Sequence, residues 1–188
     1  MKKFLRLSLF GLACIGVLLA ILAVGFFLRP ASPFSQWVPQ ADHLELSLLE
    51  PGLRDLLEKS SPELPLEDVF PIKPYGTAKA RILKKMVLTG SDFKRVSSAF
   101  LDATRPGHTQ AMCHLPVYGL RFFQGDNLLV ETSICFHCNN FYVPLPAGGY
   151  SWEALSDFSH SLRPVLESFI PIPKDLNQEL DRQVGKKP

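Results

Sequence analysis

The 188-residue sequence lacks the local motifs that mark the common nucleotide-binding and hydrolytic enzymes. It has no glycine-rich phosphate loop, no His-Glu-x-x-His zinc motif and no Gly-x-Ser-x-Gly nucleophile turn. It also has no internal repeat, which excludes a solenoid or a propeller. Because the carboxylates are dispersed as well, the sequence predicts no catalytic residue and no cofactor-binding residue.

The chain also has little excess of either charge. Its formal net charge is +2, from 20 Lys and Arg against 18 Asp and Glu. Four of the basic residues lie within the first 30, so the remaining 16 face all 18 acidic residues and the balance there is −2. A nucleic-acid partner requires a clustered basic face, and the sequence therefore predicts none.

One long hydrophobic run is present, and it lies at the N-terminus. Residues 7–28 are 22 consecutive residues without a charge, preceded by Lys2, Lys3 and Arg6. A helix rises about 1.5 Å per residue, so the run is long enough for the roughly 30 Å hydrocarbon layer. The basic residues before it predict a cytoplasmic N-terminus, with the rest of the chain outside.

Two other interpretations of this run stay open. A cleaved signal peptide has an apolar stretch of only about 7 to 15 residues, although cleavage after Gly25 would leave Phe26 as the first residue. Cys14 as a lipid-attachment site fits the sequence less well, since Gly11-Leu12-Ala13 lacks the residue pattern that usually precedes a lipid-modified cysteine. The favoured prediction is an uncleaved transmembrane helix within residues 1–29, which contacts membrane lipid.

The residues after the anchor divide into three predicted regions. Residues 30–74 contain eight prolines and form a predicted spacer with one short helix from Pro51. Residues 75–170 form the predicted folded domain. Residues 171–188 lack apolar periodicity and form a predicted flexible tail.

The predicted domain is of the α+β class, with a small antiparallel sheet and the order β-α-β-β-α. Residues 75–82 alternate like a strand with one buried face, and the next residues change to helical spacing until Pro106-Gly107. A hairpin follows, and a helix from Ser151 to Phe169 closes the domain, kinked at Pro164.

The hairpin register follows from its turn and its hydrophobic pattern. A three-residue turn at residues 125–127 pairs Gln124 with Leu128, which buries Tyr118 and Leu120 on one face and sets Arg121 opposite Glu131. Continued outward, this register places His114 opposite Cys138. A bulge at Pro116 would turn Cys113 to face Cys138 instead.

The open end of this hairpin therefore gathers cysteines and histidines, for which three interpretations stay open. The first is a Cys113–Cys138 disulfide in an oxidising compartment, with Cys135 as a buried thiol or with no bond. The second is a zinc site formed by Cys113, His114, Cys135 and Cys138, near which His108 and His137 also lie. The third is a thiol-disulfide enzyme, although "CFHCNNFYV" continues as strand rather than helix.

The same residues resemble an uncharacterised group of small bacterial proteins. The shared pattern includes Cys113, Pro116, Gly119-Leu120-Arg121 and Ile134-Cys135-Phe136-x-Cys138, and the likeness covers roughly residues 75–145. It departs at Val117-Tyr118, where the group carries Arg-His, and at His137, where it carries an acidic residue. The resemblance supports the fold and the cysteine cluster and implies no activity.

Together these features predict a single-pass protein of the bacterial inner membrane, with its N-terminus in the cytoplasm and its domain in the periplasm. Its predicted role is binding or structural support through an envelope protein partner, without a cofactor. The alternative is a zinc-binding or thiol-redox protein that uses Cys113, Cys135 and Cys138.

Overall fold

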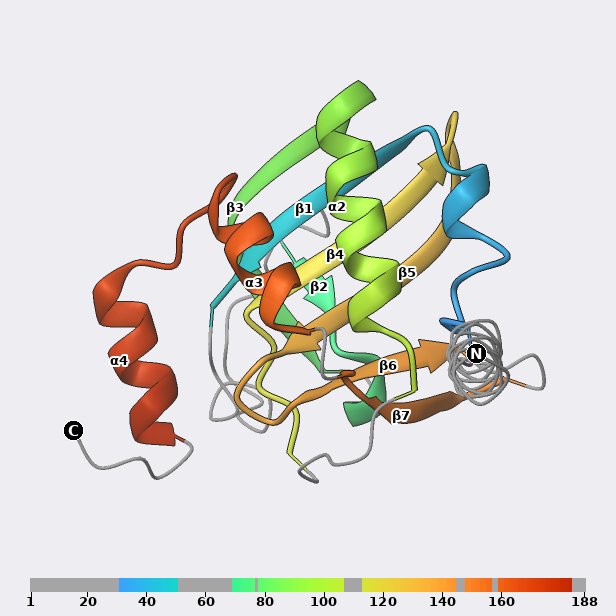
Figure 1. Ribbon diagram of the computed structural model, residues 1–188. Helices are drawn as coiled ribbons and strands as arrows, with labels where there is room; N and C mark the ends of the chain where they lie inside the picture. Colours follow the sequence, from blue (N-terminus) through green and yellow to red (C-terminus); the bar gives the residue numbers. More distant parts are fainter. Residues whose placement is uncertain are drawn as a thin grey trace, which may run out of the picture. The chain divides into compact units, whose positions relative to one another are not determined.

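A seven-stranded antiparallel sheet forms the centre of the fold (Figure 1). The computed structural model describes residues 31–50, 69–76, 78–106, 113–144, 148–156 and 159–183. The strands lie in the order β2-β3-β1-β4-β5-β6-β7. Their bounds are β1 His43–Leu49, β2 Val69–Pro71, β3 Lys79–Thr89, β4 Tyr118–Gln124, β5 Asn127–Cys135, β6 Asn140–Pro144 and β7 Tyr150–Ala154.

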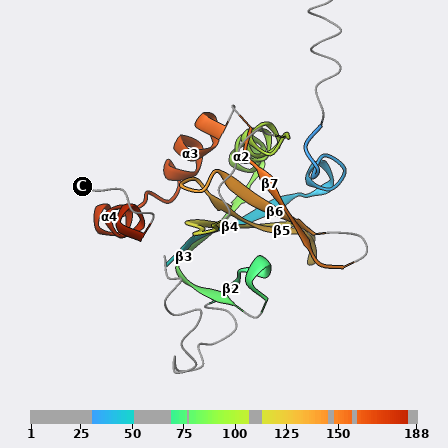
Figure 2. The same cartoon turned by 90° about the horizontal axis from the view of Figure 1, so that it is seen from below.

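Helices cover one face of this sheet, and a short segment covers part of the other. Figure 2 shows α2 (Gly90–Ala103) and α3 (Ser159–Glu167) on one side and β2 on the opposite side. The 3-10 turns η1 (Val38–Gln40) and η3 (Lys73–Tyr75) and the helix α4 (Lys174–Gln183) complete the described elements. The fold is thus a mixed α and β fold with an antiparallel sheet, and the general class predicted from the sequence is confirmed.

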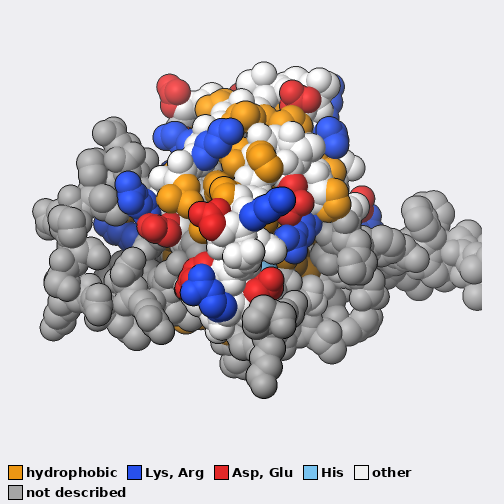
Figure 3. All heavy atoms as spheres, turned by 90° about the vertical axis from the view of Figure 1, so that its left-hand side faces the viewer, with side chains coloured by type: hydrophobic (Ala, Val, Ile, Leu, Met, Phe, Trp, Pro, Cys, Tyr) orange, Lys and Arg blue, Asp and Glu red, His pale blue; other side chains and the backbone are white. Residues whose placement is uncertain are grey.

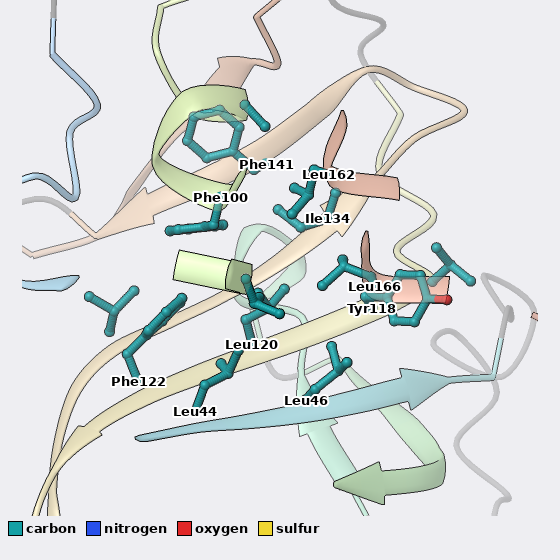
Figure 4. Close-up of a cluster of buried hydrophobic side chains, with 14 of the residues drawn as sticks. Leu44, Leu46, Phe100, Tyr118, Leu120, Phe122, Ile134, Phe141, Leu162 and Leu166 are labelled. Carbon is teal, nitrogen blue, oxygen red and sulfur yellow. The ribbon is translucent and has the colours of Figure 1, made fainter. Parts of the chain in front are cut away.

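The main core lies between the sheet and its two covering helices. Alternate residues of the strands point to this side, because successive side chains of a strand face opposite ways. Figure 4 shows the side chains that meet there from strands and helices: Leu44, Leu46, Phe100, Tyr118, Leu120, Phe122, Ile134, Phe141, Leu162 and Leu166. All are completely buried.

The middle of the sheet contains a strand that the sequence analysis assigned to the spacer. β1 pairs with β3 on one side and with β4 on the other. Leu44, Leu46 and Leu48 alternate toward the helices and are buried. The prediction of a spacer over residues 30–74 is therefore wrong for β1, because the surrounding prolines do not interrupt "HLELSLL" itself. The short helix predicted from Pro51 lies outside the described residues.

The last third of the chain also differs from the prediction. Residues 150–154 form β7, paired with β6, and the helix begins only at Ser159. Gly148 and Gly149 both have a positive φ, near 85°, and precede β7. Trp152 and Leu155 fit helical spacing by chance, so the pattern could not show this strand. Residues 174–183 form α4 rather than a fraying tail, since Leu180 is buried in the core.

The β4–β5 hairpin has the predicted face and the predicted central pair, but a different turn. Arg121 pairs with Glu131, as the sequence predicts. Gln124, however, pairs with Asn127 and not with Leu128, so the loop has two residues and Gly125 has a φ of +53°. A bulge at Leu129 then adds one residue to β5. The shorter turn and the bulge offset each other, which restores the predicted register at Arg121.

A row of alternating charges crosses the sheet on the face opposite the helices. Arg121 donates to Glu45 at 3.0 Å and to Glu131 at 2.9 Å. Lys85 lies 3.4 Å from Glu45, and Lys73 lies 3.9 Å from Glu131. Less than a fifth of the Arg121, Glu45 and Glu131 side chains is exposed. Arg121 therefore neutralises two carboxylates that are largely removed from water.

Replacing Arg121 by Met should lower the free energy of unfolding by about 2 kcal/mol, because both carboxylates then lose their central partner. Chemical denaturation measures the change. The matched control is Arg121→Met combined with Glu45→Gln and Glu131→Gln, which removes the charges together and should recover part of the loss. A triple variant less stable than the single one would contradict this explanation.

The part of the chain that the structure describes contains no helix that is both long and apolar enough to cross a membrane. The predicted anchor, residues 7–28, lies outside the described residues.

Candidate functional site: the disulfide and a buried histidine

The open end of the β4–β5 hairpin is closed by a disulfide between Cys113 and Cys138, whose Cα atoms are 5.9 Å apart. Cys113 lies ahead of β4, and Cys138 lies in the turn between β5 and β6. This is the pair that the sequence analysis favoured. The route to it differs from the prediction, because β5 ends at Cys135 and the chain turns over residues 136–139.

This turn changes the pairing predicted beyond the hairpin. Asn139 has a φ of +53°, a left-handed conformation that Asn tolerates better than most residues. The chain then returns as β6, with Asn140 opposite Cys135. The prediction that His114 lies opposite Cys138 in an extended strand is therefore wrong. His114 instead binds a residue of β5 and one of β6.

Cys135 is a free thiol within the core. Its Sγ accepts hydrogen bonds from the backbone N–H of Cys138 at 3.1 Å and of Leu115 at 3.3 Å. Burial raises the pKa of the Cys135 thiol above its ordinary value, and the N–H donors offset only part of that effect. A protonated, buried thiol is a poor nucleophile, so Cys135 has a structural role in this state.

The four predicted zinc ligands are not arranged as a metal site in this structure. Cys113 and Cys138 share a bond, so neither offers a thiolate. Within the described ranges, no three His, Cys, Asp or Glu side chains are grouped as metal ligands. His137 binds Asp181 of α4 at 3.0 Å. His108 lies outside the described residues.

His114 connects the disulfide segment to two neighbouring strands. Its Nδ1 lies 2.7 Å from Oδ1 of Asn140, and its Nε2 lies 2.7 Å from Oγ of Ser133. Nδ2 of Asn140 donates to the carbonyl of Cys113 at 2.6 Å. Since Asn140 thus presents its oxygen to the ring, Nδ1 of His114 carries the proton and Nε2 accepts one from Ser133.

Burial keeps this histidine neutral. The ring is completely buried, and it packs edge-to-face with the Trp152 ring at a centroid distance of 5.0 Å. Burial lowers the pKa of His114 from 6.5 to about 4, and the hydrogen bond to Asn140 opposes that change only in part. The charged form is therefore absent at neutral pH.

The order Ser133, His114, Asn140 matches that of a nucleophile, a base and an orienting group. None of the three side chains is exposed, however. The β2–η3 segment, residues 69–76, lies nearby: Tyr75 accepts a hydrogen bond from the His114 N–H at 2.9 Å. Phe70 packs so closely on β4 that a Cβ at Gly119 would lie 2.5 Å from its ring. The three residues are thus a closed polar network of the core.

Sequence reasoning named His114 but missed Ser133 and Asn140. Ser133 is one of several strand serines, and nothing in its local sequence sets it apart. Asn140 faces His114 only because the chain reverses after Cys135. "NN" directly after Cys138 was the available signal for that turn, since Asn favours left-handed positions.

A pocket of about 370 Å³ lies beside α3 and α4, and none of its lining residues is a cysteine. Its lining residues are Arg163, Glu167, Pro171, Ile172, Lys174, Asn177 and Gln178. Arg163 already donates to Glu167 at 2.7 Å and to Asn177 at 3.2 Å. Its charge is therefore balanced within the chain and does not indicate an anionic ligand.

No family model matches this chain, and no curated protein or solved structure is similar to it. The resemblance to small bacterial proteins therefore stays a prediction, and the role of the domain has to be inferred from its own geometry.

Proposed function

We propose that this chain is a membrane-anchored protein of the bacterial envelope, whose domain outside the cytoplasm is a binding or structural module. The observation that carries the proposal is the disulfide between Cys113 and Cys138. Disulfides persist in oxidising compartments, and the cytoplasm keeps most thiols reduced. The uncharged run at residues 7–28, with basic residues ahead of it, supports the same location.

A role without catalysis is supported by how the chemically active side chains are used. Cys135 is buried and protonated, and the Ser133–His114–Asn140 network is closed to solvent. The anchor contacts lipid, and the partner of the domain is another envelope protein. A nucleic-acid partner is not proposed, since the residues after the anchor carry a balance of −2.

Three measurements on the full chain in a bacterial host test this proposal. First, N-terminal sequencing of the protein isolated from membranes should find its original N-terminus. A start at Phe26 would contradict an uncleaved anchor. Alkaline phosphatase fused after Pro188 should be active, because that enzyme folds only outside the reducing cytoplasm. An inactive fusion would contradict the proposed orientation.

The third measurement separates the disulfide from the zinc alternative. After denaturation without reductant, a maleimide should label two of the four cysteines, Cys14 and Cys135, and all four after reduction. The matched control, Cys113→Ser, should expose Cys138 and so give three labels without reductant. About one equivalent of zinc in the native protein, with all four cysteines labelled once denatured in chelator, would replace the proposal with a metal-binding role.

A further inference from the structure

One margin of the sheet has no neighbouring strand among the described residues. β2 pairs with β3 only over three residues, from Lys79 to Arg81. The rest of β3, from Ile82 to Thr89, pairs with β1 on its inner side. We call residues 82–89 the free β3 edge. On its outer side the backbone has no strand partner among the described elements, and such an edge is a template for another strand.

Several side chains of this edge are exposed, and two of them are large and hydrophobic. Val87 is 59% exposed and Leu83 is 43% exposed; with Leu128, they are the exposed large hydrophobic residues of the described chain. Lys84 and Lys85 are exposed between them. Figure 3 views the molecule from the left-hand side of Figure 1, and hydrophobic side chains there lie among those of Lys, Arg, Asp and Glu. The edge combines apolar contact area with positive charge.

All the charges of β3 have the same sign. Lys79, Arg81, Lys84 and Lys85 are its four charged residues, and none is acidic. Lys85 lies near Glu45 of β1. The other three have no ion-pair partner among the described residues. Lys79 and Arg81 lie where β2 pairs with β3, whereas Lys84 lies on the free β3 edge, so a strand added there would meet the uncompensated positive charge of Lys84.

This charge disfavours a second copy of the same chain as the added strand. Two antiparallel copies related by a two-fold axis between Lys84 and Lys85 set Lys84 of each copy opposite Lys85 of the other. With the axis at the middle of residues 82–89, the same lysines take diagonal positions on one face. Like charges at facing strand positions are destabilising, and edge lysines are a common protection against self-pairing. The same lysines favour carboxylates on a different chain.

We propose that the free β3 edge binds an extended, acidic segment of another protein, which adds a strand to the sheet beside β3. The added backbone hydrogen bonds with the unpaired edge of β3, as in other cases of strand addition. Its carboxylates lie near Lys84, and its apolar residues contact Leu83 and Val87. This inference rests on the proposed binding role and names the surface and the kind of partner.

The test uses the purified full chain in a non-ionic detergent and three fluorescent peptides of eight residues. The first alternates Glu and Val, the second alternates Lys and Val, and the third is the first with alternate amide nitrogens methylated. Methylation keeps the charge but removes the N–H groups that pair with a strand. Fluorescence anisotropy at low ionic strength should show that the Glu peptide binds about tenfold more tightly than either of the others.

Two charge-reversal variants locate the binding site. Lys84→Glu should weaken binding of the Glu peptide by about tenfold, because it places a carboxylate on the edge itself. The matched control, Lys174→Glu on α4, makes the same change of net charge at another exposed position and should change the affinity by less than about twofold. Circular dichroism checks that both variants stay folded.

Several results would overturn the inference. Equal binding of the methylated peptide would show general charge attraction and no strand addition. Equal loss in Lys84→Glu and Lys174→Glu would show the same, and absence of binding to the unaltered chain would reject the edge. A dimer in sedimentation that Val87→Lys dissociates would assign the edge to a second copy. None of these outcomes bears on the labelling and fusion measurements, so the two proposals fail separately.

Discussion

Cys113→Ser and Cys138→Ser should each lower the free energy of unfolding by about 3 kcal/mol. The disulfide joins residues 25 positions apart and so restricts the unfolded chain over a loop of intermediate length. Its removal makes the unfolded state more favourable, whichever cysteine is replaced. Thermal or chemical denaturation of the full chain, without reductant, measures the change.

The matched control is Cys135→Ser, at a third cysteine in the same cluster. Its hydroxyl can still accept the N–H groups of Leu115 and Cys138, so the expected loss is only about 1 kcal/mol. Reductant should bring the unaltered chain to the stability of Cys113→Ser, and a chelator should have no effect. If Cys135→Ser is as damaging as the other two and a chelator reproduces the loss, the cysteines hold a metal.

The second large effect is a loss of stability at acid pH that depends on His114. The pKa of His114 is about 4 in the folded protein, against 6.5 for the ordinary side chain. Above pH 6.5 both states are neutral and no stability is lost. Between pH 6.5 and about 4 the unfolded state takes up a proton and the folded state does not, which costs about 3 kcal/mol in total.

Denaturant titrations at a series of pH values measure this effect. His114→Gln is the control, because Gln keeps a donor and an acceptor but does not titrate. The variant should be less stable than the unaltered chain at pH 7, and the gap should narrow by about 3 kcal/mol as the pH falls to 4. Parallel curves for the two proteins would show that His114 does not control the acid response.

How much the sequence predicts depends on how local each interaction is. The faces and the central pair of the β4–β5 hairpin follow from alternation over adjacent residues, and α2 follows from helical spacing within one segment. The bulge at Leu129 could not be predicted, because it compensates for a turn that is one residue shorter than expected. The central pair of Arg121 with Glu131 holds in the structure because these two deviations cancel.

Predicting β1 and β7 would have required knowledge of their contacts with residues far away in the sequence. β1 is a strand because β3 and β4 flank it, and the local signal was a short alternating segment among prolines. Trp152 belongs to a strand because Tyr142 pairs with it and the Tyr75 ring packs against it. Its spacing along the chain equally fits a helix, so only the tertiary contacts decide.

The candidate site divides in the same way. The Cys113–Cys138 pair could be predicted, since the hairpin brings its two flanking segments together. The hydrogen bonds of His114 could not, because they require the reversal at Asn139 and the return of β6. Sequence analysis thus found the cysteines and the histidine of the cluster and missed the hydrogen bonds that hold His114 in the core.

The central position of β1 has a consequence for the order in which the chain folds during synthesis. β1 is made before every other described strand, yet Glu45 meets Arg121 of β4, which is 76 residues later. At about 5 to 20 residues per second, roughly 4 to 15 s pass before β4 has been made. During that interval Leu44, Leu46 and Leu48 lack β4, one of the two strands that flank them in the finished sheet. The sheet therefore cannot form in its final order one strand at a time from the N-terminus, because β1 gains its second neighbour only when β4 has been made.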